Sequence, residues 1–255
     1  MYALLSSTRY DRSLENFEWN NDIDGPSSFF LLRYHFDRLL DASNQHGWQK
    51  AQRSLSYSQL KQKCREEVER EGQGHAHKVR ITLSEEGEIE VTLSPVSPFE
   101  RDPLGLAHID PTSDLSRDEP IISVYLDTTP TTSSLFTHTK TTQRALYDEA
   151  RVRAKIASPT SEVVLYNENL EITEASISNV SFFRAGRWTT PAESTGCLPG
   201  VIRRLLLEKN FIDEDHEKSL TKDTILEGDW VLLSNGVHGC RLGRITAVPF
   251  QQQKL

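Results

Sequence analysis

Apolar residues near the start of the chain predict two strands and a helix separated by polar segments. The apolar stretch at 2–5 predicts a strand that enters a polar turn at 6–9. An acidic loop is indicated over 11–27. Residues 29–40 change from four consecutive apolar side chains to helical spacing, which is typical of a strand leading into an amphipathic helix.

A second helix is predicted over 58–71. Leu60, Cys64 and Val68 recur at helical spacing there, and the other positions are polar or charged. Ser58 is of a type that caps helix starts, so the sequence places the first turn at this residue.

Strict alternation over 78–95 predicts a β-hairpin. Its apolar positions alternate with polar ones on both sides of Gly87: Val79, Ile81, Leu83, Ile89, Val91 and Leu93. This period of two is the pattern of half-buried strands, and the glycine-containing turn fixes how they pair.

The stretch 95–120 holds five of the eleven prolines and has weak periodicity. Such a segment is typical of a connection between lobes. We therefore expect a smaller N-terminal α+β lobe at 1–118 and a larger C-terminal lobe at 119–255.

Beyond this connection the pattern predicts further short elements. Strands are expected at 121–126, 162–167, 180–188 and 229–234, and a helix at 200–210. Hairpins segregated from flanking helices favour an α+β fold over a doubly wound parallel sheet.

Composition and charge limit the class of partner. Hydrophobic residues make up 36% of the chain and charged residues 26%, which fits a globular protein. The net charge of −8 argues against binding of nucleic acid or an anionic membrane, because both require clustered Lys and Arg. A small anionic metabolite is still compatible with a locally basic pocket.

The cysteines and the chain start indicate a reducing compartment. Three cysteines with no CxxC spacing predict neither a disulfide framework nor a zinc site, so no metal is expected. Residues 1–20 lack the pattern of a secretory signal, and no apolar run approaches the roughly 20 residues of a membrane helix. We expect a cytoplasmic protein.

One lysine lies in an unusual context. Lys140 lies within a segment, 131–142, that contains six Thr, two Ser and no acidic residue, and a predicted helix begins near Arg144. A lysine that attacks an aldehyde must sit in a walled pocket that lowers its pKa. Taken alone, a lysine is usually a solvated surface residue.

Three other segments supply partners for such a lysine. Glu174 follows a predicted strand and precedes Ser178 and Asn179. The turn 195–203 has the order Thr-Gly-Cys-Leu-Pro-Gly-Val-Ile-Arg and opens a predicted helix, so its backbone N–H groups suit a phosphate. The segment 35–39 carries an arginine, a permanent forked cation suited to a dianion.

Together these segments resemble the class IV aminotransferase family of fold type IV. The family includes D-amino-acid and branched-chain aminotransferases and aminodeoxychorismate lyase, all of which use pyridoxal phosphate. Residues 140–151 read Lys-Thr-Thr-Gln-Arg-Ala-Leu-Tyr-Asp-Glu-Ala-Arg, which is similar to the fungal-type lyases. The resemblance implies a two-lobed fold with the cofactor between the lobes, and a homodimer.

The resemblance also assigns roles to residues. Lys140 would be the catalytic lysine, Glu174 would face the ring nitrogen, Leu198 would lie against the ring, and Arg38 would hold the phosphate. The other expected cofactor-binding residues are Asn179, Gly200, Val201, Ile202, Ser234 and Asn235. The family usually has Ile-Thr after the second glycine, so Val201-Ile202 loses a hydroxyl contact and keeps the amides.

Three residues are substrate candidates. Ser7 lies in a segment similar to the strand that faces substrate in the lyases. Tyr147 is either a pocket residue or a partly buried helix aromatic. Arg80 is either a carboxylate partner or a solvent-facing charge beside Lys78.

Two reactions and one inactive state are consistent with these residues. The lyase releases pyruvate from 4-amino-4-deoxychorismate to give 4-aminobenzoate, a folate precursor. The alternative is a transaminase acting on a D- or branched-chain amino acid or an (R)-amine. The chain lacks the Gly-Asn-Tyr run of the branched-chain enzymes after Lys140 and an Arg-x-His pair in 78–120. A catalytically degenerate binding protein of the same fold is the third possibility.

Overall fold

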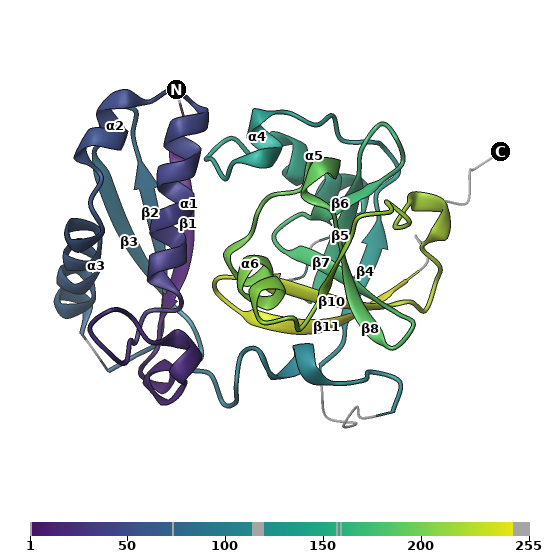
Figure 1. The fold of residues 1–255 in the computed structure, drawn as a ribbon, viewed down its shortest axis with the longest axis horizontal. Coiled ribbons are helices and arrows are strands. Elements are labelled where there is room, and N and C mark those ends of the chain that lie inside the picture. Colours follow the sequence, from purple (N-terminus) through teal and green to yellow (C-terminus); the bar gives the residue numbers. More distant parts are fainter. Residues whose placement is uncertain (1, 73, 114–119, 157, 159, 247–255) are drawn as a thin grey trace.

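Two β-sheets organise the protein in a computed structural model (Figure 1). The structure describes residues 2–72, 74–113, 120–156, 158 and 160–246. One sheet has three strands in the order β1-β2-β3, and the other has eight in the order β6-β5-β4-β11-β10-β7-β8-β9. Both sheets carry helices, so the predicted α+β class with two lobes is confirmed.

The N-terminal lobe is an antiparallel sheet packed against helices. Its elements are β1 (Leu4–Tyr10), α1 (Leu32–Gln45), α2 (Gln49–Ser54), α3 (Tyr57–Glu71), β2 (His77–Leu83) and β3 (Ile89–Pro95), with 3-10 turns η1 (Arg12–Asn16) and η2 (Glu18–Asn20). Leu4, Leu39, Leu60 and Ile81 are among the fully buried side chains between sheet and helices. The apolar stripes of α1 and α3 therefore meet the inner face of the sheet, as their sequence pattern predicted.

The hairpin predicted from alternation is confirmed. β2 and β3 pair antiparallel with Ile81 opposite Val91. The turn between them has Gly87 at a φ of +89°, a conformation that favours glycine.

The expected polar turn at 6–9 is wrong, because β1 continues through this segment to Tyr10. Three of its polar side chains, those of Ser6, Thr8 and Arg9, are buried and have partners. Thr8 Oγ1 donates to the carbonyl of Phe30 at 2.6 Å, and the Ser6 hydroxyl lies 2.8 Å from His35 Nδ1. Buried hydrogen-bonded hydroxyls are compatible with a strand interior, and the sequence alone did not reveal these partners.

Two further boundaries differ from the predictions. The expected strand at Phe29 reduces to one isolated bridge with Tyr10, and α1 begins at Leu32. The N-cap of α3 is Ser56 in place of Ser58, since its side chain accepts a hydrogen bond from the backbone of Gln59.

The C-terminal lobe is built on the eight-stranded mixed sheet. Its strands are β4 (Ile122–Leu126), β5 (Ser161–Tyr166), β6 (Ile172–Ala175), β7 (Asn179–Arg184), β8 (Arg187–Pro191), β9 (Asp213–Asp215), β10 (Trp230–Asn235) and β11 (Gly239–Ile245). Its helices are α4 (Leu135–His138), α5 (Ala145–Arg153) and α6 (Val201–Glu208), and its 3-10 turns are η4 (Glu193–Thr195) and η5 (Lys222–Thr224). The turn η3 (Gly105–His108) lies in the connection between the lobes.

The strand pairing in this lobe departs from simple hairpins. β4 runs parallel to both β11 and β5, so segments far apart in the sequence meet at the centre of the sheet. The strands β6, β9 and β11 were not predicted, because each is short or interrupted by polar residues. The expected strands at 121–126 and 162–167 correspond to β4 and β5.

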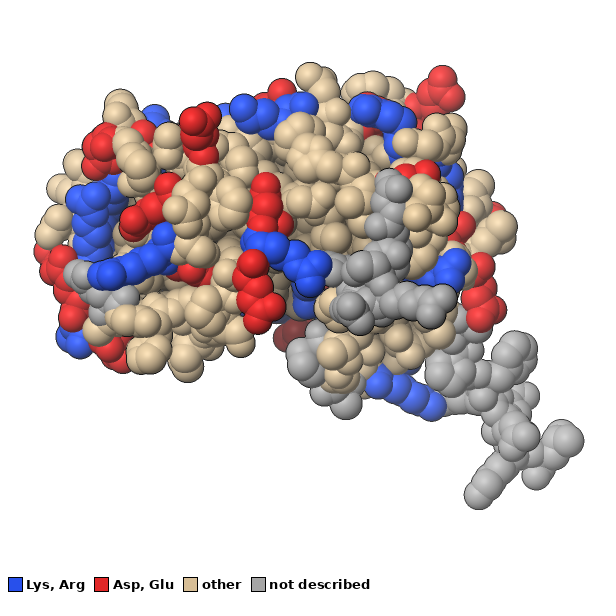
Figure 2. Space-filling model, turned by 90° about the horizontal axis from the view of Figure 1, so that it is seen from below, with Lys and Arg blue, Asp and Glu red and all other residues tan. Residues whose placement is uncertain are grey.

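The connection between the lobes crosses residues that the structure does not describe. The expected boundary near 118 lies within 114–119, outside the described residues. Among the described residues, no helix is long and apolar enough to cross a membrane. Figure 2 shows one face of the molecule, where acidic and basic side chains are interspersed.

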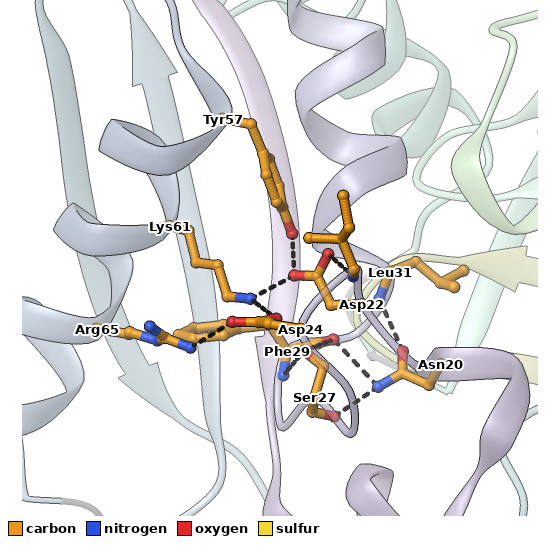
Figure 3. Close-up of polar contacts among 10 residues, drawn as sticks. Asn20, Asp22, Asp24, Ser27, Phe29, Leu31, Tyr57, Lys61 and Arg65 are labelled. Carbon is orange, nitrogen blue, oxygen red and sulfur yellow. Dashed lines mark hydrogen bonds and ion pairs between the residues drawn. The ribbon is translucent and has the colours of Figure 1, made fainter.

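A buried ionic cluster fixes the loop that precedes α1 (Figure 3). Lys61 on α3 lies 2.6 Å from the Asp22 carboxylate and also pairs with Asp24. The Tyr57 hydroxyl donates to the same Asp22 carboxylate. Asn20 accepts a hydrogen bond from the backbone of Leu31 at 2.9 Å, so the loop is held at both ends.

We expect Lys61→Met to lower the free energy of unfolding by about 3 kcal/mol, because it leaves the buried Asp22 carboxylate without its cation. Urea denaturation followed by circular dichroism measures the change. The matched control is Lys50→Met, whose pair with Glu86 is exposed on both sides and should cost less than about 1 kcal/mol. Equal effects of the two substitutions would contradict the assigned role of Lys61.

Candidate active site

A cavity of about 220 Å³ lies between the two lobes. Residues of β1, β2 and α1 line it from the N-terminal lobe, and residues of β6, β7, α6 and β10 line it from the C-terminal lobe. Twelve of the predicted site residues line this cavity: Ser7, Arg38, Arg80, Lys140, Tyr147, Glu174, Asn179, Leu198, Gly200, Val201, Ser234 and Asn235. The structure therefore brings together side chains that are up to 228 positions apart.

The backbone of Lys140 is held against the edge of β1. Its carbonyl accepts a hydrogen bond from the backbone of Leu5 at 2.8 Å, and Thr142 donates to the carbonyl of Ala3 at 2.9 Å. Burial of the amine lowers the pKa of Lys140 to about 7, and the neighbouring Arg38 and Arg144 act in the same direction. This is the environment in which a lysine becomes a nucleophile at neutral pH.

Glu174 is the buried carboxylate of the cavity and lies on β6. Burial raises its pKa, although a hydrogen bond from the Tyr147 hydroxyl at 2.7 Å and one from the backbone of Leu198 oppose this shift. Lys140 also favours the charged form of Glu174. The two hydrogen bonds aim a carboxylate oxygen in a fixed direction, as a partner for a ring N–H would require.

The turn before α6 is held by Asn179. Its side-chain amide donates to the carbonyl of Leu198 at 2.7 Å. A Cβ built on Gly200 would lie 1.7 Å from Asn179 Oδ1, so only glycine fits this position. No side chain caps the first turn of α6, which leaves the N–H groups of Val201 and Ile202 available to a ligand.

Arg38 projects from α1 into the cavity and is half-buried. Its Nη2 donates to the Ser6 hydroxyl at 2.8 Å. Its Nε is buried and has no hydrogen-bond partner among the described residues. Burial lowers the pKa of Arg38 to about 10, so a bound anion would stabilise this cation.

The turn after β10 closes one end of the cavity. Asn235 donates to the Ser178 hydroxyl at 3.1 Å, and its Oδ1 accepts from the backbones of Val237 and His238. Ser234 pairs with Asn179 in the register of β10 with β7. The predicted Ser234-Asn235 segment thus adjoins the turn before α6.

Ile202 was predicted to contribute its backbone N–H, and its side chain points away from the cavity. The Ile202 side chain is buried in the apolar cluster around Leu205 and Leu242, and it does not line the cavity. In a helix the side chain one position after a cavity-facing residue points about 100° away, which explains the difference. Its contribution to a ligand is limited to the backbone.

The structure also places the residues for which alternatives were open. Arg80 is half-buried and lines the cavity. Tyr147 is buried and bonded to Glu174. His138, a neighbour of Lys140 in sequence, is half-buried and does not line the cavity, and its Nε2 lies 3.1 Å from the Ser133 hydroxyl.

Several cavity residues were missed by sequence reasoning. Lys78 and Arg144 line the cavity, as do Gln143 and Ser176. The alternation of β2 did indicate that Lys78 and Arg80 share a face. It did not indicate that the second lobe covers this face. Among the described residues, no group of His, Cys, Asp or Glu could hold a metal ion.

Comparison with known proteins identifies one family. The family model for amino-transferase class IV matches residues 17–244. A protein of Schizosaccharomyces pombe, provisionally named aminodeoxychorismate lyase, is 32% identical over 212 residues, which cover 81% of this chain and 80% of that protein. The aminodeoxychorismate lyase of Saccharomyces cerevisiae is 29% identical over 206 residues, which cover 66% of this chain. The chain matches only 51% of the length of that relative.

Solved structures share the fold. A provisionally named 4-amino-4-deoxychorismate lyase from Legionella pneumophila superposes with a TM-score of 0.68 at 15% identity, covering 97% of this chain and 83% of that one. The branched-chain aminotransferase of Thermoproteus uzoniensis superposes with a TM-score of 0.66 at 18% identity, covering 97% and 78%. These identities are low, so the two likenesses establish the architecture alone.

We expect Lys140 to react with formaldehyde and a hydride donor in a pH-dependent manner with a midpoint near 7. A lysine with an ordinary pKa has a neutral fraction on the order of 0.04% at pH 7, whereas about half of Lys140 would be neutral there. Peptide mass spectrometry measures the rate at each pH, with the exposed Lys209 as internal comparison. Parallel pH profiles for Lys140 and Lys209 would contradict the lowered pKa.

Proposed function

We propose, on the premise that this chain belongs to the class IV amino-transferase family, that it is a pyridoxal-phosphate lyase. Its substrate would be 4-amino-4-deoxychorismate, and its products would be pyruvate and 4-aminobenzoate. The observation that carries the proposal is the convergence of Lys140, Glu174 and Arg38 on one cavity. The names of the fungal relatives supply the choice of substrate.

The residues present fit the phosphate of the cofactor. The Nε of Arg38 is buried without a partner among the described residues, which is costly unless an anion binds it. The uncapped N–H groups at the start of α6 add partial positive charge at the same side of the cavity. Gly200 leaves room for the Asn179 side chain, which holds the turn that presents these N–H groups.

The residues also fit the ring of the cofactor. Glu174 would hold the ring nitrogen protonated, and its hydrogen bond from Tyr147 keeps the carboxylate directed toward it. Leu198 is buried at the cavity wall and would lie against the ring face. Lys140 would bind the aldehyde carbon.

Pyridoxal phosphate, when bound, supplies a conjugated ring that accepts an electron pair. Lys140 would remove the proton from the carbon that bears the substrate amino group. The bond between the ring carbon and the enolpyruvyl oxygen then breaks, and the ring becomes aromatic. The departing enolate takes up one proton at its methylene carbon, which balances the proton held by Lys140, and becomes pyruvate. The low pKa of Lys140 suits this role, because a neutral amine can accept a proton.

The transaminase is the second candidate. It would use the same Lys140 to move the proton to a second carbon, and it would require a keto acid as acceptor. The absence of an Arg-x-His pair in 78–120 and of Gly-Asn-Tyr after Lys140 favours the lyase. A degenerate binding protein is disfavoured because Lys140, Glu174 and Arg38 are all retained. We also propose a homodimer, by analogy with the family.

We expect the purified protein with pyridoxal phosphate to release fluorescent 4-aminobenzoate from 4-amino-4-deoxychorismate without any keto acid. D-alanine, L-leucine and a simple (R)-amine, each offered with a keto acid, should give no comparable turnover. Fluorescence and coupled detection of pyruvate measure the reaction. Turnover that depends on the keto acid would instead identify a transaminase.

We expect Lys140→Ala to lose the visible absorption band that remains with the protein through gel filtration, and to form 4-aminobenzoate at least about 100-fold more slowly. The matched control, Lys209→Ala, should keep both the band and the rate, since Lys209 is exposed on the surface. A protein that stays colourless with added pyridoxal phosphate would favour the degenerate alternative.

A further inference from the structure

The cavity carries more positive charge than the cofactor accounts for. Five lysine and arginine side chains line it, against one carboxylate, that of Glu174, and burial lowers the pKa of the lining His238 to about 4, so its imidazole adds no charge near pH 7. The basic residues are Arg38, Lys78, Arg80, Lys140 and Arg144. Proteins rarely gather unpaired cations in a partly buried space unless an anion occupies it.

The alternation of β2 directs two of these cations into the cavity. His77, Val79 and Ile81 are buried on the inner face of the strand, while Lys78 and Arg80 are half-buried on the other. In the register of β1 with β2, Arg80 lies opposite Ser7, another residue that lines the cavity. Within the described part of the chain, neither Lys78 nor Arg80 forms an ion pair with a carboxylate.

Arg144 reaches the cavity from the other lobe and is held in place. Its Nη2 donates to the carbonyl of Ser176 at 2.6 Å, and its guanidinium lies 4.9 Å from the centre of the Tyr147 ring. Tyr147 in turn donates to Glu174. The remaining N–H groups of Arg144 are directed by this packing and can bind an anion in a forked geometry.

The cations of β2, Lys78 and Arg80, lie farther from Lys140 than Arg144 does. Residues 140–142 pair with one edge of β1, and β2 pairs with the opposite edge. Neighbouring strands are about 4.8 Å apart and residues along a strand about 3.3 Å apart. Lys140 adjoins Leu5, so Arg80, opposite Ser7, arises roughly 12 Å from the Lys140 backbone, and Lys78, opposite Arg9, roughly 16 Å. Arg144 follows Lys140 by four residues and packs on the Tyr147–Glu174 pair, next to the reacting end.

We propose that these cations form a two-part dicarboxylate subsite, in which Lys78 and Arg80 bind the ring carboxylate of the substrate and Arg144 binds the enolpyruvyl carboxylate. The inference rests on the proposed function and extends it to substrate recognition. In 4-amino-4-deoxychorismate the ring carboxylate lies across the ring from the amino group. The enolpyruvyl group is attached to the carbon next to the amino group. This arrangement matches the far and near positions of the two cation sets.

The charges balance in this arrangement. A phosphate monoester carries about two negative charges, and the substrate carries two carboxylates. These four negative charges are matched by the four cations of the cavity other than Lys140, which are Arg38, Lys78, Arg80 and Arg144. Burial and the nearby Arg80 and Arg144 lower the pKa of Lys78, which means that they disfavour its charged form. A bound carboxylate would stabilise that charged form.

The test uses two unreactive ligands on the protein reconstituted with pyridoxal phosphate. Chorismate carries both carboxylates and a hydroxyl in place of the amine, whereas 4-hydroxybenzoate carries the ring carboxylate alone. Isothermal calorimetry measures each Kd. We expect Lys78→Met and Arg80→Met to weaken both ligands by roughly 10- to 100-fold, the usual worth of a charged hydrogen bond.

Arg144→Met should weaken chorismate by a similar factor and leave 4-hydroxybenzoate unchanged. The matched control Lys209→Met should leave both Kd values unchanged, and Lys78→Arg should restore most of the affinity lost in Lys78→Met. The visible band of the bound cofactor and circular dichroism verify that each variant is folded and loaded.

The outcomes separate the subsite from the reaction. Unchanged chorismate affinity in the three variants, or no chorismate binding by the original protein, would overturn the subsite. Formation of 4-aminobenzoate from 4-amino-4-deoxychorismate is measured on the same preparation. If the predicted binding pattern holds and no 4-aminobenzoate forms, the subsite stands and the proposed lyase function fails.

Discussion

The pairing of residues 140–142 with β1 is the interaction on which the site depends. The hydrogen bonds from Leu5 to the Lys140 carbonyl and from Thr142 to Ala3 join the two lobes through the main chain. They place the lysine on the same side of the N-terminal sheet as Ser7 and Arg80. Because main-chain bonds do not depend on side-chain rotamers, the lysine is positioned by the fold itself.

Burial then determines the chemistry of the two central groups. The cavity removes Lys140 and Glu174 from bulk water, which disfavours the charged form of each and moves their pKa values toward neutrality. Arg38 and Arg144 add to the shift of Lys140, whereas Tyr147 counteracts that of Glu174 through its hydrogen bond. Adjacent groups with opposed shifts are typical of sites that exchange protons near pH 7.

The sequence indicated the residues at the centre of the site better than the charged residues that line the rest of the cavity. Lys140, Glu174 and Arg38 could be found because their types and order carry a recognisable chemistry. Lys78 and Arg144 could not, since an outward-facing strand cation reads as solvent-exposed until the lobe that covers it is known. The same limit explains β11, whose parallel pairing with β4 joins strands more than 100 residues apart. Ile202 was assigned by motif position, and helical geometry turned its side chain into the core.

Gly236 lies where the two lobes pack closely against each other. A Cβ built there would lie 2.6 Å from the His35 ring and 2.8 Å from the carbonyl of Ser7. The turn after β10 therefore packs against both α1 and β1 with no room for a side chain. Any glycine codon becomes an alanine codon by one nucleotide change, and the added methyl group would push these segments apart. Evolution could thus alter the width of the cavity mouth in one step. Relatives that act on bulkier substrates would be expected to carry a residue larger than glycine at this position.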